Sequence, residues 1–122
     1  IKNDSITQPK LIGDINKAID GIFNMGTKLI ILKKGMDGCV IYESTKQAQK
    51  VPSYKVNAVN VLGAGDAFAA GFIFGYLHGW SNYKSCRLAN ACGAWLVTKN
   101  GCCNVAPTFE EISMFINSNG GY

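Results

Sequence analysis

Apolar residues recur at helical spacing near the start of the chain, between Pro9 and Gly26. Polar residues fill the positions between them, and Gly26 supplies the backbone freedom that commonly ends a helix. This pattern predicts a helix that packs through one face on a flat surface. The apolar positions are Leu11, Ile12, Ile15, Ile19, Ile22 and Phe23.

The next apolar run is continuous rather than periodic. Residues 29–32 are all apolar, which is typical of a strand buried on both faces, as in a parallel sheet. A turn at 35–38, a returning strand at 39–42 and an extended segment at 49–56, interrupted by Pro52, predict a small antiparallel meander. Because a helix followed by a buried strand is typical of α/β proteins, we expect this meander at the edge of a larger sheet.

From residue 66 onward the apolar spacing is helical. It predicts helices over 66–78, over about 83–99 and from Thr108, which opens a capping box with the glutamate three residues later. Gly71 and Gly75 lie four residues apart in the first of these helices. Because glycine has no Cβ, we expect another backbone to approach closely at these two positions.

Composition narrows the class of protein. The chain of 122 residues is 48% hydrophobic and 16% charged, which is typical of one packed domain. Its net charge is +4 and its lysines are scattered, so a nucleic-acid partner is not indicated. The longest apolar run, 67–77, is shorter than the roughly 20 residues that span a bilayer, so we expect no membrane partner.

Five cysteines, an odd number, occur without a C-x-x-C pair and beside a single histidine. This favours reduced thiols in the cytoplasm over a disulfide framework or a zinc site. No signal peptide is visible. The chain opens on isoleucine, and its first residues resemble a loop joined midway, so we expect a portion of a longer protein.

The strongest candidate site is the stretch Gly63, Ala64, Gly65 and Asp66 at the start of an apolar helix. Glycine tolerates positive φ and leaves room for a ligand, so several backbone N–H groups can point into one small volume. The positive end of the helix dipole favours a phosphate oxygen there. Asp66 is then suited to accept the proton of an attacking hydroxyl. A plain turn with an aspartate cap explains the same residues, and the residues alone leave both interpretations open.

The stretch N-V-L-G-A-G-D-A-F at 60–68 resembles the C-terminal signature of the ribokinase-like (PfkB) carbohydrate kinases, D-T-x-G-A-G-D. The resemblance covers nearly the whole chain and puts Asp66 at the position of the catalytic base, with Gly63, Ala64 and Gly65 as the anion hole. It implies the C-terminal part of a three-layer αβα fold, with a mostly parallel central sheet and an antiparallel edge meander.

Two further stretches resemble the nucleotide site of this family. L-K-K-G-M-D-G-C-V at 32–40 implies that Gly35 and Gly38 approach ATP and that Lys33 reaches its phosphates, with Mg²⁺ as the accompanying metal. L-A-N-A-C-G-A-W-L-V-T-K-N-G at 88–101 implies that Asn90 borders the adenine. The resemblance also implies a site for a monovalent cation such as K⁺. Its ligands would be the backbone carbonyls of Asn60, Leu62, Leu96, Lys99, Gly101 and Val105.

Details of these stretches resemble one branch of the family, which phosphorylates 5-dehydro-2-deoxygluconate in myo-inositol breakdown. The resemblance thus implies transfer of a phosphoryl group from ATP to a primary hydroxyl of a small sugar or sugar acid. Fructose, ribose and 2-dehydro-3-deoxygluconate stay open as alternative acceptors. A non-catalytic nucleotide-binding or regulatory module and a generic phosphate-binding α/β domain stay open as alternative functions.

The family's sugar-binding glycine pair and its lid belong to an N-terminal half that has no counterpart in residues 1–122. The N-x-x-E element that the family associates with magnesium and phosphate is absent from the sequence as well. We therefore expect the whole chain to be the C-terminal nucleotide-binding portion of a kinase domain. Any homo-oligomer would form through the N-terminal half.

Overall fold

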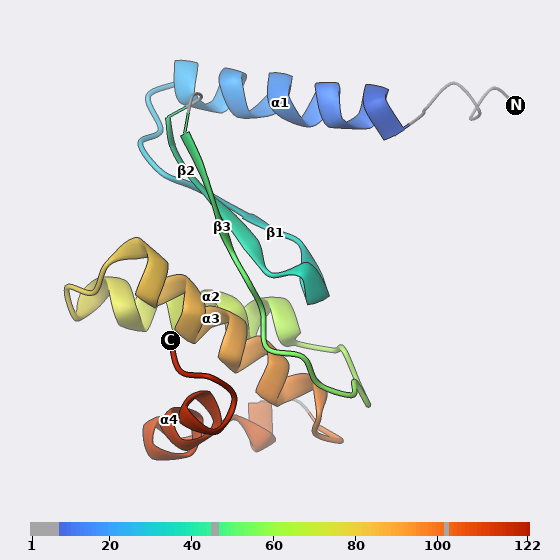
Figure 1. The fold of residues 1–122 in the computed structure, drawn as a ribbon, viewed down its shortest axis with the longest axis vertical. Coiled ribbons are helices and arrows are strands. Elements are labelled where there is room, and N and C mark those ends of the chain that lie inside the picture. The colour runs from blue at the N-terminus through green and yellow to red at the C-terminus, as the bar shows by residue number, and fades with distance from the viewer. Residues whose placement is uncertain (1–7, 45–46, 102) are drawn as a thin grey trace, which may run out of the picture.

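A computed structural model describes residues 8–44, 47–101 and 103–122. Figure 1 shows three parts along the long axis of the molecule: one helix at one end, a sheet in the middle and the remaining helices at the other end. The helices are α1 (Gln8–Asn24), α2 (Ala64–Leu77), α3 (Asn82–Val97) and α4 (Phe109–Ser118), with short 3-10 turns η2 (Gly35–Asp37) and η3 (Cys103–Val105). The strands are β1 (Ile30–Lys33), β2 (Cys39–Ser44) and β3 (Gln47–Val51).

The sheet is the predicted antiparallel meander, in the order β1-β2-β3. Ile31 pairs with Ile41, and Val40 pairs with Lys50. The central strand β2 buries its first three residues, whereas the apolar residues of β1 are only half-buried. The expectation of a strand buried on both faces at 29–32 is therefore not met in the described structure, where the apolar residues of β1 are only half-buried. Every described pairing is antiparallel, so a parallel central sheet stays a prediction.

Helix α1 forms where the periodicity predicts it but packs less than expected. Ile19 is buried, whereas Ile15 is exposed. Figure 1 shows why: α1 lies across the far end of the sheet, away from the other helices. The apolar face of α1 is consequently covered only in part.

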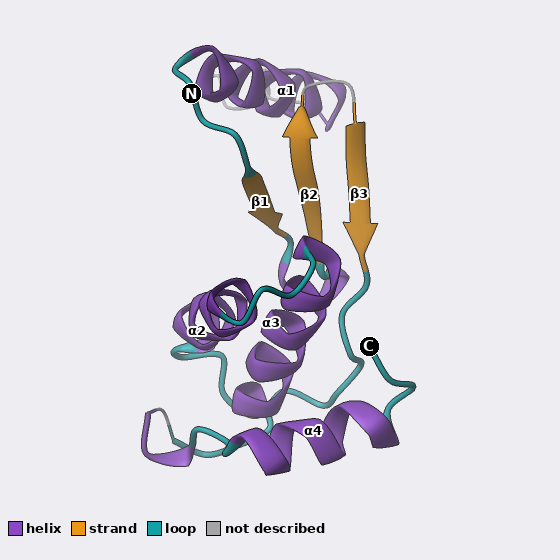
Figure 2. Ribbon diagram, turned by 90° about the vertical axis from the view of Figure 1, so that its left-hand side faces the viewer, coloured by secondary structure: helices purple, strands orange, loops and turns teal. Residues whose placement is uncertain are grey.

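Helix α3 is the most buried element among the described residues, with every residue from 85 to 91 buried. It packs against α2 on one side, α4 on another and the ends of β2 and β3 (Figure 2). Two apolar clusters result. The first cluster joins the sheet to α2 and α3 and consists of Cys39, Ile41, Val51, Phe68, Cys86 and Ala89. The second cluster joins α3 to α4 and to the segment after β3 and consists of Tyr54, Leu88, Ala91, Ala94, Ile112 and Ile116.

The predicted close approach at Gly71 and Gly75 is confirmed. A Cβ built on Gly71 would lie 2.9 Å from the Cα of Ala89, and one on Gly75 would lie 2.8 Å from the Cβ of Ser85. Both separations are shorter than any ordinary carbon–carbon contact. Helices α2 and α3 therefore meet backbone to backbone, which only glycine permits here.

The predicted capping box of α4 is also confirmed. The amide of Glu111 donates to Thr108 Oγ1 at 3.1 Å, and the amide of Thr108 donates to Glu111 Oε1 at 2.9 Å. Two otherwise unpaired backbone N–H groups are satisfied in this way. None of the helices in the described part of the chain is long and apolar enough to span a membrane.

Replacing Gly75 with alanine should destabilise the protein by about 1–3 kcal/mol, the usual range for overpacking. The new methyl group would overlap Ser85 and force α2 away from α3. Urea denaturation measures the change. Gly21→Ala in α1 is the matched control, because a Cβ there meets nothing within 4 Å, and it should be neutral or slightly stabilising. Equal stability of the two variants would contradict the close-packing argument.

Candidate functional site

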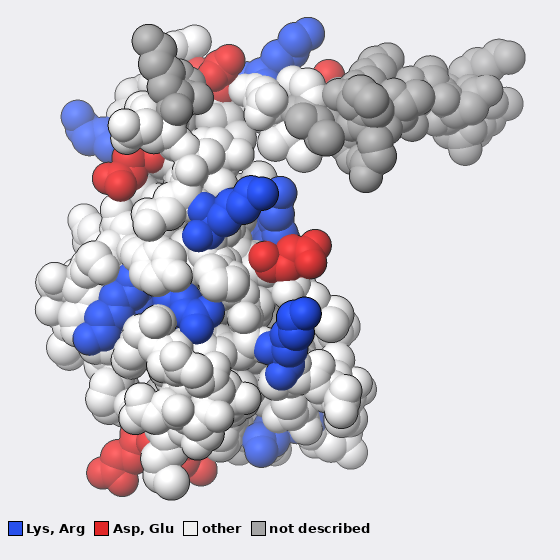
Figure 3. Space-filling model, in the orientation of Figure 1, with Lys and Arg blue, Asp and Glu red and all other residues white. Residues whose placement is uncertain are grey.

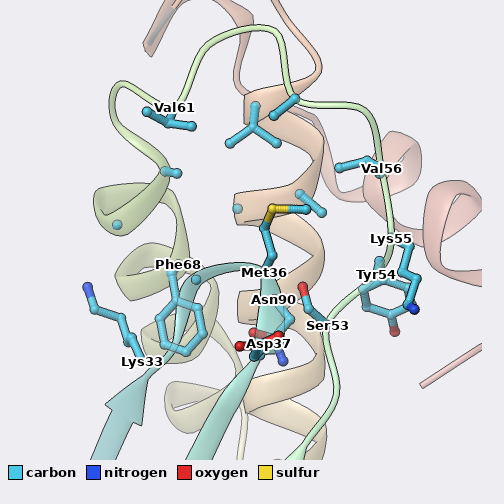
Figure 4. A pocket seen from close by; sticks show the side chains of 18 residues that line it. Lys33, Met36, Asp37, Ser53, Tyr54, Lys55, Val56, Val61, Phe68 and Asn90 are labelled. Atoms are coloured by element: carbon cyan, nitrogen blue, oxygen red, sulfur yellow. The ribbon is translucent and has the colours of Figure 1, made fainter. Parts of the chain in front are cut away.

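A cavity of about 660 Å³ opens between the end of the sheet, the start of α2 and the middle of α3. Figure 4 shows Lys33 and Phe68 on one side of it, Ser53, Tyr54 and Lys55 on the other, and Met36 between them. Six of the predicted nucleotide-site and anion-hole residues line this one cavity, although they come from three separate segments, whereas Gly63 does not line it. The six are Lys33, Gly35, Gly38, Ala64, Gly65 and Asn90.

The turn after β1 forms one rim of the cavity. Its two glycines have positive φ, +58° at Gly35 and +87° at Gly38, and the amide of Gly38 donates to the Gly35 carbonyl at 3.1 Å. A Cβ on Gly38 would contact the Val51 carbonyl oxygen and lie 2.9 Å from the Ser53 nitrogen. Gly38 thus lets the turn lie directly against the end of β3, where the opposite wall begins.

The start of α2 is a tight turn capped by a glycine with a left-handed backbone. Gly63 caps the helix with φ of +83°, and the Asn60 side chain accepts the amide of Leu62 at 3.0 Å. The amide of Ala64 donates to the Val61 carbonyl at 3.2 Å. The N–H group of Ala64 is therefore already hydrogen-bonded within the turn.

Gly65 differs from the expectation in its backbone. It lies inside the first turn of α2 and lacks the positive φ of Gly63. Its amide and that of Asp66 have no backbone acceptor among the described residues, as is usual for the first turn of a helix. What the absence of a side chain at Gly65 provides is space, because a Cβ there would lie 3.2 Å from Lys33 Nζ.

Two sources of positive potential therefore meet at this point. The Lys33 ammonium group lies beside the first turn of α2, 5.6 Å from the centre of the Phe68 ring. The N-terminus of α2 carries a partial positive charge from the helix dipole. An anionic group bound between them would be attracted by both.

Asp66 is exposed and does not line the cavity, but it follows the lining residue Gly65 directly. It begins an exposed stripe along α2 at helical spacing. Below Asp66 this stripe is apolar, and Ile73 and Leu77 are 54% and 74% exposed. The exposed residues of the stripe are Asp66, Ala69, Ala70, Ile73, Tyr76 and Leu77.

Asn90 has a structural task that the sequence did not indicate. Its side chain is buried, and its Nδ2 donates to the carbonyls of Val51 at 3.3 Å and Pro52 at 3.0 Å. It lines the cavity and at the same time holds the end of β3. Sequence reasoning also missed Ser53 and Tyr54, because Pro52 ends the strand pattern just before them.

The carbonyls expected around a monovalent cation lie on segments that the structure joins. The amides of Val59 and Asn60 donate to the Val97 carbonyl at 2.6 and 3.1 Å, so the loop before α2 meets the end of α3. The Leu96 carbonyl accepts the amide of Lys99, and the Val105 carbonyl accepts Trp95 Nε1. Among the described residues, no group of three or more His, Cys, Asp or Glu side chains is arranged to hold a metal ion.

Burial and hydrogen bonding shift the pKa values of Tyr54, which lines the cavity, and of three cysteines outside its lining. Burial raises the pKa of Tyr54, and the positive charge of Arg87 opposes that shift in part. Burial also raises the pKa of the Cys92 thiol to about 11. A hydrogen bond from Cys86 lowers the pKa of Cys39, while the same bond raises that of Cys86. Cys39, Cys86 and Cys92 are free, and Cys102 and the side chain of Cys103 lie outside the described residues.

Basic side chains do not form a continuous stripe on the face shown in Figure 3. They lie in separate small groups, with acidic side chains beside them and toward both ends of the molecule.

Comparison with known proteins decides the family. Residues 4–109 match the profile of the pfkB family of carbohydrate kinases. The chain belongs to the pfkB family. The family resemblance drawn from the glycine-rich signature is therefore confirmed.

Individual pfkB relatives agree with this assignment. A 5-dehydro-2-deoxygluconokinase of Geobacillus thermodenitrificans is 31% identical over 103 residues, covering 84% of this chain and 31% of that protein. The crystal structure of ribokinase from Thermotoga maritima matches with a TM-score of 0.78 and 27% identity, over 84% of this chain and 34% of that one. A putative ribokinase II from E. coli, in complex with ATP and Mg²⁺, matches with a TM-score of 0.77 and 34% identity, over 84% of this chain and 33% of that one.

These matches confirm a ribokinase-type α/β fold. They also show that this pfkB chain spans about a third of the length of the relatives it matches.

The two glycines of the turn after β1 should tolerate alanine unequally. Gly35→Ala should cost about 1–2 kcal/mol of unfolding free energy, the penalty of a left-handed backbone, because its Cβ meets nothing within 4 Å. Gly38→Ala should cost more, because its Cβ also overlaps the carbonyl of Val51. Chemical denaturation of both variants tests this, and a larger loss for Gly35→Ala would refute the contact at β3.

Proposed function

We propose that the chain is the nucleotide-binding portion of an ATP-dependent kinase that phosphorylates a primary hydroxyl of a small sugar or sugar acid, and that it also carries the catalytic base. The observation that carries this proposal is the meeting of the Lys33 ammonium group and the N-terminus of α2 at the wall of the cavity. Family membership supports the reaction type.

The cavity has a chemistry that suits a nucleotide. Its wall on α3 and on the segment after β3 is largely apolar, with Val56, Ala94 and Val97, which suits a purine base. Its opposite side carries Lys33 and Gly65, which suit phosphate oxygens. In this proposal the adenine lies near Asn90 and the phosphates lie toward α2, with Mg²⁺ bound to them.

The transfer needs a base beside the phosphates and donors for the developing charge. Asp66 accepts the proton of the sugar hydroxyl as that oxygen bonds to the γ-phosphorus and the bond to the ADP oxygen breaks. The amides of Gly65 and Asp66, with the Lys33 ammonium, stabilise charge on the phosphoryl oxygens. We assign no such role to the Ala64 amide, because it donates to Val61.

The monovalent cation site is part of the proposal in a weakened form. Asn60 stands where the signature has aspartate, so one negative charge fewer lies beside the expected carbonyls. The loop before α2 and the end of α3 are nevertheless joined at Val97. We therefore propose K⁺ binding that is weak and that acts by ordering the loop before α2.

The sugar-binding portion of the kinase would cover the exposed stripe of α2 that Asp66 begins. Helix α2 is apolar on all sides, which is typical of a helix buried on all sides. The chain spans 31% of the length of the Geobacillus relative, whose remaining length could supply the covering portion. In this proposal the acceptor sugar reaches Asp66 between that portion and α2, and any homo-oligomer forms through that portion.

The acceptor that we propose is 5-dehydro-2-deoxygluconate. Relatives named as kinases of this compound match at 31% and 34% identity. Of the residues that the structure describes, Cys39, Cys86 and Cys92 are free, which suits a reducing compartment such as the cytoplasm.

Asp66→Asn in the complete kinase should lower kcat by about 10²–10⁴-fold, the usual contribution of a general base. Affinity for ATP should stay within about twofold, because the amide keeps the size of the side chain and Asp66 does not line the cavity. A coupled ADP-release assay and equilibrium binding measure the two quantities. Asp20→Asn on α1 is the control, and near-normal turnover of Asp66→Asn would remove Asp66 as the base.

The same ADP-release assay identifies the acceptor when the complete kinase is offered four compounds side by side: 5-dehydro-2-deoxygluconate, fructose, ribose and 2-dehydro-3-deoxygluconate. We expect the highest kcat/KM with the first. Preference for another sugar would keep the mechanism and reject the acceptor. ATP binding without turnover of any of the four would instead favour a regulatory module.

A further inference from the structure

The backbone carbonyl of Pro52 anchors the cavity wall that follows β3 to helix α3. Residues 53–56 line the cavity, and the carbonyl of Pro52 lies where this wall begins. It accepts Arg87 Nη1 at 2.5 Å and Asn90 Nδ2 at 3.0 Å. Both donors come from α3 and are one helical turn apart, so α3 fixes the position of the wall through this atom.

Arg87 holds more than Pro52. Its Nη2 donates to the Gly121 carbonyl at 2.9 Å, and its guanidinium carbon lies 4.0 Å from the centre of the Tyr54 ring. The Tyr54 hydroxyl donates to the same Gly121 carbonyl at 2.8 Å. The guanidinium therefore links three segments that are far apart in the sequence: the wall, α3 and the chain after α4.

The glycines after α4 make this link possible. Gly120 and Gly121 have φ of +103° and +84°, a conformation that other residues rarely adopt. The resulting turn brings the Gly121 carbonyl to both Arg87 and Tyr54. The ring of Tyr122 packs edge-on against Trp80 and lies 4.8 Å from Lys84 Nζ.

Burying the charged Arg87 side chain carries an unfavourable desolvation free energy. Its side chain is 8% exposed, and its Nε is buried without a hydrogen-bond partner. The donors that are satisfied bond to neutral carbonyls, whereas buried charges are usually paired with an opposite charge. The planar guanidinium of Arg87 fixes the relative position of two carbonyls, because it donates to both in a rigid geometry.

We propose that Arg87 is a positioning residue for nucleotide binding, acting through the Pro52 carbonyl and the Tyr54 ring on the wall at 53–56. Arg87 does not line the cavity itself, so its effect passes through these two groups. The inference rests on the proposed nucleotide site.

Two variants and one control test this. Arg87→Met removes both hydrogen bonds and keeps much of the volume, and Arg87→Lys keeps the charge but offers one ammonium in place of a fork. Lys84→Met lies one turn away on α3, where Lys84 contacts the rings of Trp80 and Tyr122. Lys84 makes no hydrogen bond or ring contact with residues 52–56 or with Gly121 in the described structure, so this control leaves both Arg87 hydrogen bonds in place.

The measurements, made on the complete kinase, are the Kd of a fluorescent trinitrophenyl-ATP, the KM for ATP, kcat, and amide hydrogen exchange at 53–56 without nucleotide. Arg87→Met should raise Kd and KM about tenfold or more, as expected for lost hydrogen bonds from a charged group. Its kcat should stay within about threefold, and exchange at 53–56 should quicken. Arg87→Lys should fall between it and the unaltered protein, and Lys84→Met should leave Kd unchanged.

If Arg87→Met does not fold, Arg87→Lys tests the inference in its place, because the lysine retains the buried charge. An unchanged Kd with unchanged exchange at 53–56 in a folded Arg87 variant would overturn the inference while leaving the proposed function intact. Failure of the unaltered kinase to bind the nucleotide would overturn the proposed function, and the inference with it.

Discussion

The close approach of α2 and α3 is the contact on which the rest of this structure depends. Gly71 meets Ala89 and Gly75 meets Ser85 with no space for a side chain between the two backbones. This contact fixes α3 in the middle of the molecule, where its other sides receive α4 and the ends of β2 and β3. Because interiors are close-packed, a shift of α2 would displace the sheet and the cavity together.

The cavity forms where the turn after β1, the start of α2 and the segment after β3 come together, and each of these is stabilised by different contacts. The turn after β1 is held by the left-handed conformations of its glycines, the start of α2 by the capping turn at Gly63, and the wall after β3 by Asn90 and Arg87 of α3. The start of α2 contributes the partial positive charge of its helix dipole, and Lys33 at the end of β1 contributes a full positive charge beside it. Lys55 in the wall after β3 also lines the cavity, so each of the three elements combines shape with positive charge.

The exposed stripe of α2 connects this arrangement to catalysis. A helix that is apolar on every side is stable in water only where its outer face is covered, yet Ile73 and Leu77 are exposed. The stripe begins at Asp66, the proposed base. A portion of protein that covered it would therefore close over the carboxylate as well, which links burial of the apolar face to assembly of the proposed active site.

The sequence by itself determined the features that neighbouring residues encode. Helical spacing, the capping box at Thr108, the turn at Gly35 and the glycine-rich start of α2 each depend on residues within a few positions of one another. Only the tertiary structure decided the exposure of β1 and the anchoring of Pro52. These depend on partners far along the chain, such as Arg87 and Gly121, 34 residues apart, and no local pattern specifies which distant carbonyl a buried donor will meet.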